Sequence, residues 1–263
     1  MERIGCLWTG GLDSTYTIAY FSKFEVEIQP YYLLDKNRNS QKYELKAIEE
    51  ISDIFRNDKH VKAKIMPLIT KNVDNIAPDD EIKKSFKKLR KQMPLGSQYE
   101  WLARFAKEIG SDSLYVSIEK SDHSIGRKCV YDNGDVIHYF ENEYEYFSID
   151  KDKSTQDCIN VFGRFRFPMS WDRTKKEEVQ ELVDMGYEDV LKKVWFCFDP
   201  VVRNGNVEKC GICNPCRTYI KAGFRNLFSE EALQRYEKIE KTPHWVHQLR
   251  DYKNLALIKL GLK

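Results

Sequence analysis

The sequence predicts an α/β fold with a parallel sheet, followed by a small cysteine-rich segment near the C-terminal end. Three observations predict it. Short apolar runs alternate with helical patterns through most of the chain, which is typical of βαβ units around a parallel sheet. A glycine turn lies between the first apolar run and the first helical pattern. Further along, four cysteines lie within twenty residues.

Hydrophobic periodicity places the expected elements in chain order. Strands are expected over residues 3–7, 26–34, 63–69, 113–118 and 161–167. Helices are expected over residues 15–24, 41–55, 98–109 and 174–185. Residues 131–150 are expected to form a hairpin that turns at Asn133-Gly134, a dipeptide that favours two-residue turns. This hairpin is interpreted either as a changed wall of the binding site or as a surface insertion.

The composition indicates a soluble enzyme. Hydrophobic residues make up 41% of the 263 positions and charged residues 32%, which suffices for a core and a solvated surface. No apolar run approaches the ~20 residues that cross a bilayer, and no signal peptide is visible. We therefore expect a cytoplasmic protein without a membrane partner. The net charge of +2 neither favours nor excludes nucleic acid, and the basic cluster between Lys83 and Lys91 forms either a solvated helix face or a phosphate-binding patch.

The glycine turn, Trp-Thr-Gly-Gly-Leu-Asp-Ser-Thr at positions 8–15, has the composition of a phosphate-binding loop. Glycines let backbone amides approach an anion, and a helix start adds unpaired N–H donors. Asp13, taken as a solvent-facing loop carboxylate, is the expected magnesium ligand. The loop is not a Walker loop, because no Lys follows the glycines, and a plain turn at a strand end is the alternative. The residues expected to bind ATP are Thr9, Gly10, Gly11, Leu12, Asp13, Ser14 and Thr15.

The cysteine spacing C-x12-C-x2-C-x2-C predicts a metal site. Gly211 and Pro215 turn the chain between the cysteines, so that several thiolates can converge. Four thiolates make a closed tetrahedral site, which favours structural zinc over an iron–sulfur cluster. Disulfides are not expected without an export signal. The expected ligands are Cys197, Cys210, Cys213 and Cys216, and the structural or surface thiols are Cys6, Cys129 and Cys158.

Together, the glycine loop and the cysteine spacing resemble the QueC-like 7-cyano-7-deazaguanine synthases of the PP-loop ATP pyrophosphatase superfamily. The loop resembles that superfamily's Ser/Thr-Gly-Gly-x-Asp-Ser motif. Pro168-Met169-Ser170-Trp171, followed by Lys175 and Glu177, resembles the family's Pro-Leu-x-Trp…Lys-x-Glu segment. The resemblance covers residues 1 to about 225 and implies an adenine-nucleotide α-hydrolase-like, Rossmann-like sheet.

This resemblance also implies a reaction. The family's members adenylate 7-carboxy-7-deazaguanine with release of pyrophosphate, then use ammonia to form an amide and finally a nitrile. The implied cofactors are ATP, Mg²⁺ and structural Zn²⁺. The implied catalytic residues are Asp13 and Lys175, of which Lys175 neutralises charge on the leaving pyrophosphate.

Two stretches depart from the family pattern. Leu95-Gly96-Ser97-Gln98 stands where the family has Pro-Gly-Arg-Asn, which loses a guanidinium. Residues 125–129 replace the family's Tyr-Pro-Asp-Cys-Arg. Two alternatives therefore stay open. The adenylated acid could pass to an amine of a protein or peptide, as suits QueC-like proteins of antiviral gene clusters, or the chain could be a degenerate nucleotide-binding module.

Three segments are expected: an ATP-binding domain over residues 1–194, a zinc segment over 195–228 and a helical extension over 229–263. Ser229-Glu230-Glu231 has the composition of a helix start. Apolar stripes at Leu233, Tyr236 and Ile239 and at Trp245, Leu249 and Tyr252 either pack on the core or form a dimer or partner surface. We expect a homodimer.

Overall fold

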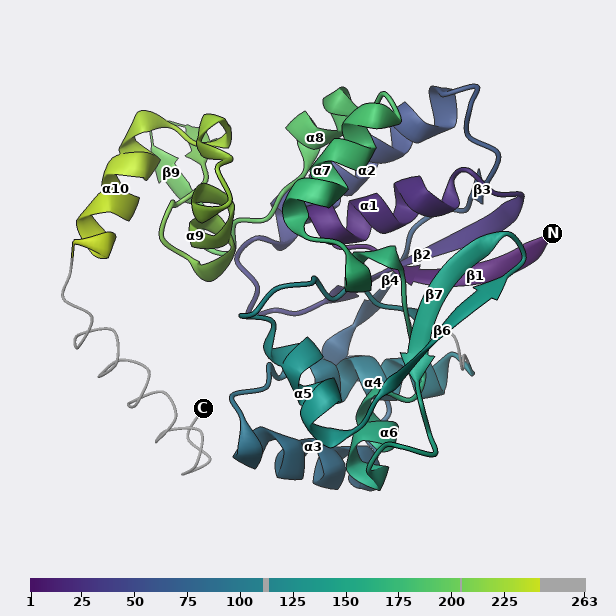
Figure 1. Cartoon of the computed structure of the whole chain (residues 1–263). Helices are drawn as coiled ribbons and strands as arrows, with labels where there is room; N and C mark the ends of the chain where they lie inside the picture. The colour runs from purple at the N-terminus through teal and green to yellow at the C-terminus, as the bar shows by residue number, and fades with distance from the viewer. Residues whose placement is uncertain (111–113, 204, 242–263) are drawn as a thin grey trace. The chain divides into compact units, whose positions relative to one another are not determined.

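The computed structural model describes residues 1–110, 114–203 and 205–241 (Figure 1). The chain forms two compact units, Met1–Trp195 and Phe196–Lys263. The predicted α/β class is confirmed, because the first unit has a mostly parallel sheet covered by helices on both faces. The residues Trp245, Leu249 and Tyr252 of the expected second C-terminal stripe lie outside the described residues. No helix among the described residues is long and apolar enough to span a membrane.

The sheet of the first unit runs in the order β3-β2-β1-β5-β8-β7-β6, and β4 also pairs with β2. The pairs among β1, β2, β3, β4, β5 and β8 are parallel, whereas β6 and β7 form an antiparallel hairpin on β8. Parallel strands place their carboxyl ends at one edge of a sheet, where ligands bind in open α/β folds. The strands are β1 (Glu2–Leu7), β2 (Val26–Leu34), β3 (Lys64–Ile65), β4 (Ile69–Asn72), β5 (Leu114–Tyr115), β6 (Val136–Glu141), β7 (Tyr144–Ile149) and β8 (Phe165–Phe167).

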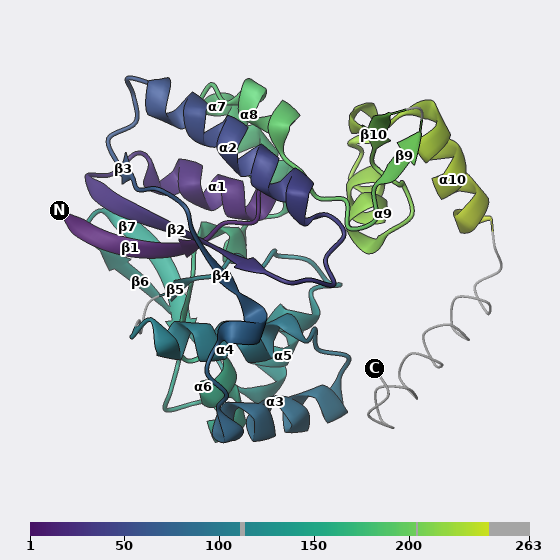
Figure 2. The same ribbon diagram turned by 180° about the vertical axis from the view of Figure 1, so that it is seen from behind.

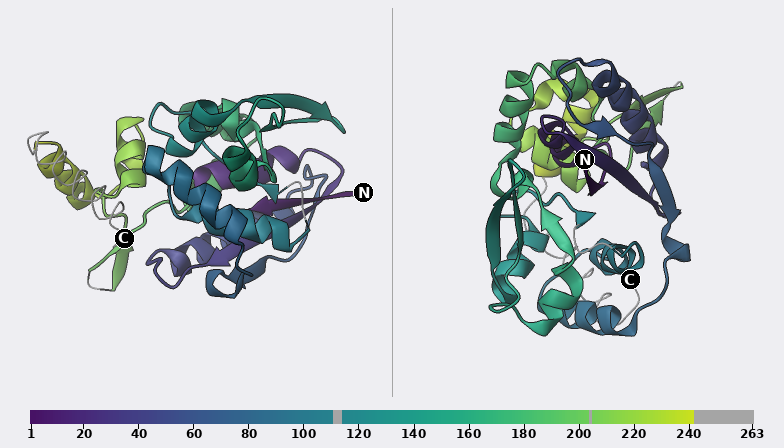
Figure 3. Two further views of the ribbon diagram at one scale, coloured as in Figure 1. Left: turned by 90° about the horizontal axis from the view of Figure 1, so that it is seen from below. Right: turned by 90° about the vertical axis from the view of Figure 1, so that its right-hand side faces the viewer.

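Two helical layers enclose this sheet (Figures 1 and 2), and Figure 3 shows them from below and from the side. One layer contains α1 (Leu12–Phe21), α2 (Gln41–Asn57), α7 (Lys175–Asp184) and α8 (Glu188–Lys193). The other contains α3 (Asp80–Gln92), α4 (Gln98–Glu108), α5 (Ile125–Asn133) and α6 (Gln156–Phe162). Short 3₁₀ turns are η1 (Val73–Asn75) and η2 (Met169–Asp172). Helix α1 is buried along nearly its whole length, so the turn that precedes it has a fixed support.

The hairpin expected over residues 131–150 forms, but the predicted turn is wrong. The strands meet at Asn142 and Glu143, which both have positive φ, of 50° and 71°. Asn133-Gly134 instead ends helix α5, where the Asn133 side chain donates to the carbonyl of Cys129. Asn and Gly are favoured at helix C-termini as well as in hairpin turns, so the dipeptide alone could not distinguish the two.

Three expected strands are also shorter than predicted. Of the described residues in the run 113–118, only Leu114–Tyr115 forms a strand, β5. The apolar run 63–69 is divided into β3 and β4. In the run 161–167, only the last three residues form strand β8, because the first two end helix α6. Thr155 caps that helix by accepting a hydrogen bond from the backbone N–H of Cys158. Short apolar runs suit buried helices and buried strands equally.

Within its described residues, the second unit contains a small antiparallel hairpin and two longer helices. Ser229 accepts a hydrogen bond from the backbone N–H of Ala232 and so caps the helix over Glu230–Glu240, as its sequence predicts. The elements are β9 (Val201–Arg203), β10 (Asn206–Glu208), α9 (Asn214–Lys221), η3 (Arg225–Leu227) and α10 (Glu230–Glu240).

Candidate active site and metal centre

The glycine turn joins the carboxyl end of β1 to the start of α1. Gly10 has a φ of 70°, which is left-handed backbone that favours glycine. A Cβ at this position would lie 2.8 Å from the carbonyl oxygen of Glu44, so α2 also requires glycine here. Gly11 is the N-cap of α1, and no side chain caps this helix. The first amides of α1 therefore have no side-chain acceptor, an arrangement that suits an anion.

Two hydroxyl groups lie on this turn and a third is buried beneath it. The Oγ atoms of Thr9 and Ser14 are 3.1 Å apart, and Ser14 Oγ also accepts from the backbone N–H of Thr9 at 3.1 Å. Thr15 is fully buried, and its Oγ1 accepts from the indole N–H of Trp8 at 3.0 Å. Leu12 is buried as well. Among the residues expected to bind ATP, the side chains of Leu12 and Thr15 thus lie in the core.

Asp13 and Lys175 form an ion pair at the edge of this turn. Lys175 Nζ lies 2.7 Å from Asp13 Oδ1 and 2.7 Å from Glu119 Oε2. Asp13 belongs to the first turn of α1, Lys175 is the first residue of α7, and Glu119 follows β5. The Lys175 side chain is only 11% exposed and that of Asp13 29%. The expectation that Asp13 is a solvent-facing loop carboxylate is therefore wrong, because it lies in a helix and pairs with a lysine.

The position of Lys175 follows from the local sequence of α7. Thr174 caps the helix by accepting from the backbone N–H of Glu177, and the Glu177 carboxylate accepts from the backbone N–H of Thr174 in return. This capping box fixes the first turn. The Lys175 ammonium is consequently presented to Asp13 from a rigid element.

Glu178 completes the cluster, and the sequence analysis missed it. It lies one turn after Lys175, is fully buried, and no donor N–H or hydroxyl among the described residues reaches its carboxyl oxygens. Burial and the negative charge of Asp13 raise the pKa of Glu178 well above its usual range. The three-residue spacing from Lys175 on a helix was the available signal.

Asp13 keeps its charge in the same surroundings. Burial raises the pKa of Asp13, but the nearby charge of Lys175 and the hydrogen bonding of neighbouring groups together outweigh burial, and the resulting pKa lies below the ordinary value.

The four expected metal ligands converge in the second unit. Cys197 precedes β9, Cys210 follows β10, and Cys213 and Cys216 lie at the start of α9. The four Sγ atoms all lie within 4.8 Å of one another. None of these four cysteines forms a disulfide bond in the structure.

The spacing of these sulfur atoms fits zinc. The Sγ atoms of Cys210 and Cys216 are 3.9 Å apart, whereas the edge of a tetrahedron with Zn–S bonds of ~2.3 Å is about 3.8 Å. Backbone N–H groups of Ile212 and Cys213 donate to Cys210 Sγ at 3.4 and 3.2 Å, which favours a thiolate. Hydrogen bonding, first with Cys197, lowers the pKa of Cys213 to about 7.

The cysteine cluster packs against helix α10 and is hydrogen-bonded to it. Gly211 has a φ of 79°, and a Cβ there would lie 2.2 Å from the carbonyl oxygen of Ala232. Arg235 donates to the carbonyl of Cys210 at 2.9 Å and to the Glu208 carboxylate at 2.8 Å. The cysteine turns and α10 therefore form one packed body.

Two known proteins resemble this chain at low identity. No family model matches the chain. The chain is 24% identical over 247 residues to the 7-cyano-7-deazaguanine synthase of Nautilia profundicola, covering 90% of this chain and 100% of that protein. It is 23% identical over 234 residues to the synthase of the same name from Clostridium kluyveri, covering 84% of this chain and 93% of that protein. The chain is therefore similar to QueC-type synthases over most of its length, at low identity.

Residues 125–129, one of the two stretches expected to depart from the family pattern, pack against the residue that follows the other stretch in this QueC-like chain. Gly126 of α5 packs on Tyr99 of α4, and a Cβ at Gly126 would lie 2.2 Å from the Tyr99 hydroxyl oxygen. Arg127 donates to the carbonyl of Trp171 at 2.8 Å and lies over its ring at 5.1 Å. Residues 125–129 thus lie beside Tyr99 of α4 and Trp171 of η2.

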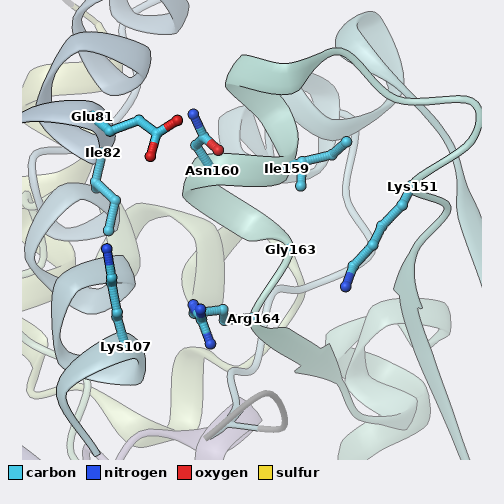
Figure 4. Close-up of a pocket in the computed structure, with 8 residues that line it drawn as sticks. All are labelled: Glu81, Ile82, Lys107, Lys151, Ile159, Asn160, Gly163 and Arg164. Carbon is cyan, nitrogen blue, oxygen red and sulfur yellow. The ribbon is translucent and has the colours of Figure 1, made fainter. Parts of the chain in front are cut away.

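Three other features of the QueC-like chain do not belong to the cluster of Asp13, Lys175 and Glu119. A pocket of about 160 Å³ lies among α3, α4 and α6 (Figure 4), lined by Glu81, Ile82, Lys107, Lys151, Ile159, Asn160, Gly163 and Arg164. The exposed face of α3 carries most of the basic cluster, including Lys83, Lys84, Lys87 and Lys91. Cys6, Cys129 and Cys158 are buried rather than surface thiols, and burial raises the pKa of Cys129 and of Cys158 to about 12.

Proposed function

We propose that this QueC-like protein is an ATP-dependent ligase that adenylates 7-carboxy-7-deazaguanine or a close relative and releases pyrophosphate. The observation that carries the proposal is the cluster of Asp13, Lys175 and Glu119 beside the glycine turn, with Lys175 Nζ 2.7 Å from both carboxylates. The names of its two relatives supply the substrate class. The turn alone supports only phosphate binding.

In this proposal the turn grips the phosphates of ATP. The backbone amides at the start of α1, together with the hydroxyls of Thr9 and Ser14, donate to the phosphate oxygens. Asp13 would hold the Mg²⁺ that accompanies ATP and screens the phosphate charge. Lys175 then exchanges one of its carboxylate partners for a phosphate oxygen.

The chemical step is displacement at the α-phosphorus. A carboxylate oxygen of the substrate attacks this phosphorus, the bond to the bridging oxygen of pyrophosphate breaks, and pyrophosphate leaves with the negative charge. Lys175 stabilises that charge, and the rigid capping box keeps its ammonium in place. No protein nucleophile is needed, so catalysis rests on positioning and charge stabilisation.

Ammonia is the proposed acceptor of the acyl group. Its attack on the acyl carbon releases AMP and gives the amide, and a second adenylation, at the amide oxygen, permits loss of AMP to give the nitrile. Zn²⁺ on Cys197, Cys210, Cys213 and Cys216 supplies structure in this scheme and takes no part in the reaction.

A second candidate keeps the adenylation and changes the acceptor to an amine of a protein or peptide. The observation that favours it is the contact of Gly126 with Tyr99, because Gly126 lies in one stretch that departs from the family pattern and Tyr99 directly follows the other. A degenerate nucleotide-binding module is the third candidate.

Product analysis separates the three candidates. Metal-replete protein is incubated with ATP, Mg²⁺ and 7-carboxy-7-deazaguanine, with and without ammonia, and products are identified by mass spectrometry. The proposal predicts AMP and pyrophosphate that depend on the acid, and amide and nitrile that depend on ammonia. Acid-dependent AMP without either product supports the protein acceptor. Absence of AMP with any deazaguanine acid supports the binding module.

A further inference from the structure

Trp195 is the last residue of the first unit, and its backbone contacts the glycine turn directly. The Trp195 N–H donates to the carbonyl oxygen of Gly10 at 2.8 Å. The carbonyl oxygen of Trp195 would lie 3.6 Å from a Cβ placed on Gly11. The turn lies near the start of the chain and Trp195 near the end of the first unit, so the glycine motif by itself does not predict this contact.

The ring of Trp195 anchors this backbone contact. It stacks on the ring of Tyr43 in α2, with the centroids 4.9 Å apart and the planes at 27°. Both residues are half-buried. Helix α2 also approaches the turn through the carbonyl oxygen of Glu44, which leaves no room for a Cβ at Gly10. The backbone of Gly10 is therefore held between α2 and Trp195.

The hydrogen bond from Trp195 sets the direction of one amide in the turn. In a trans peptide, the carbonyl of one residue and the N–H of the next point to opposite sides of the chain. Because the Gly10 carbonyl is directed at Trp195, the Gly11 N–H is directed away from it. No acceptor among the described residues takes a hydrogen bond from that N–H. Gly11 is the N-cap of α1, so its N–H adds to the unpaired amides at the start of the helix.

We propose that Trp195 is a positioning residue for the phosphates of ATP: its N–H fixes the Gly10–Gly11 peptide with the Gly11 N–H facing the anion, and its ring, stacked on Tyr43, keeps it there. Glycine adopts both signs of φ readily, so the peptide would rotate without this contact. An amide that is already oriented binds an anion without a further ordering cost. The inference rests on the proposed function only for the identity of the anion.

Two substitutions at position 195 separate the N–H from the ring. Trp195→Ala loses the ring and keeps the N–H, whereas Trp195→Pro loses both. Val194 has a ψ of 136°, the extended backbone that is favoured before proline. The Kd for ATP with Mg²⁺ is measured by isothermal titration calorimetry. We expect it to rise about threefold in Trp195→Ala and at least about tenfold further in Trp195→Pro, as the loss of one hydrogen bond predicts.

Conservative and distant variants separate positioning from a merely structural role. Trp195→Phe keeps the N–H and a ring, so its Kd should stay within about twofold of wild type. Trp101→Ala is the matched control, because it removes another half-buried indole from α4 in the other helical layer. It should lower the Tm and leave the Kd within about twofold. Equal Kd values in Trp195→Pro and Trp195→Ala overturn the proposal, as does an equal loss of binding in Trp101→Ala.

Hydrogen exchange tests the contact without a ligand and without the proline variant. The Trp195 amide of wild type should exchange at least about 100-fold more slowly than in an unfolded peptide, and about tenfold faster in Tyr43→Ala than in wild type. An unprotected Trp195 amide in wild type overturns the inference, whatever the activity. ATP binding without AMP formation refutes the proposed function and leaves the role of Trp195 standing. A wild-type protein that binds no ATP overturns both.

Discussion

Asp13 Oδ1 and Lys175 Nζ lie 2.7 Å apart, although 162 positions separate the two residues in the sequence. The contact joins the first turn of α1 to the first residue of α7. Neither residue could be assigned a role from charge alone, since exposed lysines and aspartates are common. Their meeting beside a glycine turn with positive φ at Gly10 gives both of them a position from which to act on a phosphate.

Lys175→Met should reduce pyrophosphate release by about 10²–10³-fold, the loss typical when one donor to developing negative charge is removed. Lys176→Met is the matched control, because it removes the same charge from an exposed neighbouring position. Initial rates of pyrophosphate formation at saturating ATP provide the measurement. A Lys175→Met enzyme as fast as the Lys176→Met enzyme contradicts the role.

Asp13→Asn should abolish turnover and also lower stability. The change removes the charge that faces Lys175, a side chain only 11% exposed. Loss of a hydrogen bond to a charged group at such a site costs about 1–3 kcal/mol of unfolding free energy. Urea denaturation measures the change. A urea midpoint of Asp13→Asn equal to that of wild type would mean that Asp13 is solvated, as the sequence predicts.

Glu178 makes stability depend on pH in a direction opposite to that of most carboxylates. Its folded-state pKa is raised above the ordinary value of 4.5, so between these two values only the unfolded chain has lost the proton. The free energy of unfolding then falls as pH rises, by about 1.4 kcal/mol per pH unit. Glu178→Gln cannot ionise, so its stability relative to wild type should improve from pH 5 to pH 7.

Glu177→Gln provides the control for that titration. The pKa of Glu177 is lowered by its hydrogen bonds with Thr174, first from the backbone. It is therefore ionised in folded and unfolded chains alike between pH 5 and pH 7. Its replacement should change the free energy of unfolding by the same amount at pH 5 and at pH 7. If the difference in unfolding free energy between Glu178→Gln and wild type does not change from pH 5 to pH 7, Glu178 is ionised in the folded protein.

Cys213→Ser should remove bound zinc and destabilise the second unit. Metal binding at four thiolates contributes folding free energy directly, and the same turns carry the contacts of Gly211 and Arg235 with their neighbours. Zinc content by elemental analysis and thermal unfolding are measured together. A variant that loses zinc and keeps the wild-type Tm contradicts a structural site.

The sequence predicted the parallel sheet and several elements closely, because long periodic patterns carry the information. Strand β2 spans residues 26–34 as expected, and α2 begins at Gln41 as expected. The hairpin turn was missed, because Asn133-Gly134 suits a helix end as well as a turn. Asn142-Glu143 takes positive φ without glycine.

The candidate site could be predicted in part. The glycine turn and the cysteines are local motifs, so their spacing in the sequence was enough to identify them as site candidates. The tertiary neighbourhood could not be predicted: Glu178 stands in an ordinary charged helix in the sequence and becomes a buried acid only through packing against Asp13. The same reasoning applies to Thr15, whose hydroxyl belongs to the core because it accepts from Trp8.

The most direct test of adenylation follows the oxygen atoms of the substrate carboxylate. With 7-carboxy-7-deazaguanine labelled with ¹⁸O in its carboxylate, attack of that oxygen on the α-phosphorus makes the label part of AMP when the acyl group is transferred. We predict AMP carrying one ¹⁸O atom, detected by mass spectrometry, in an amount equal to the amide present plus twice the nitrile present. Unlabelled AMP, or ADP in place of AMP, contradicts activation of the carboxylate at this site.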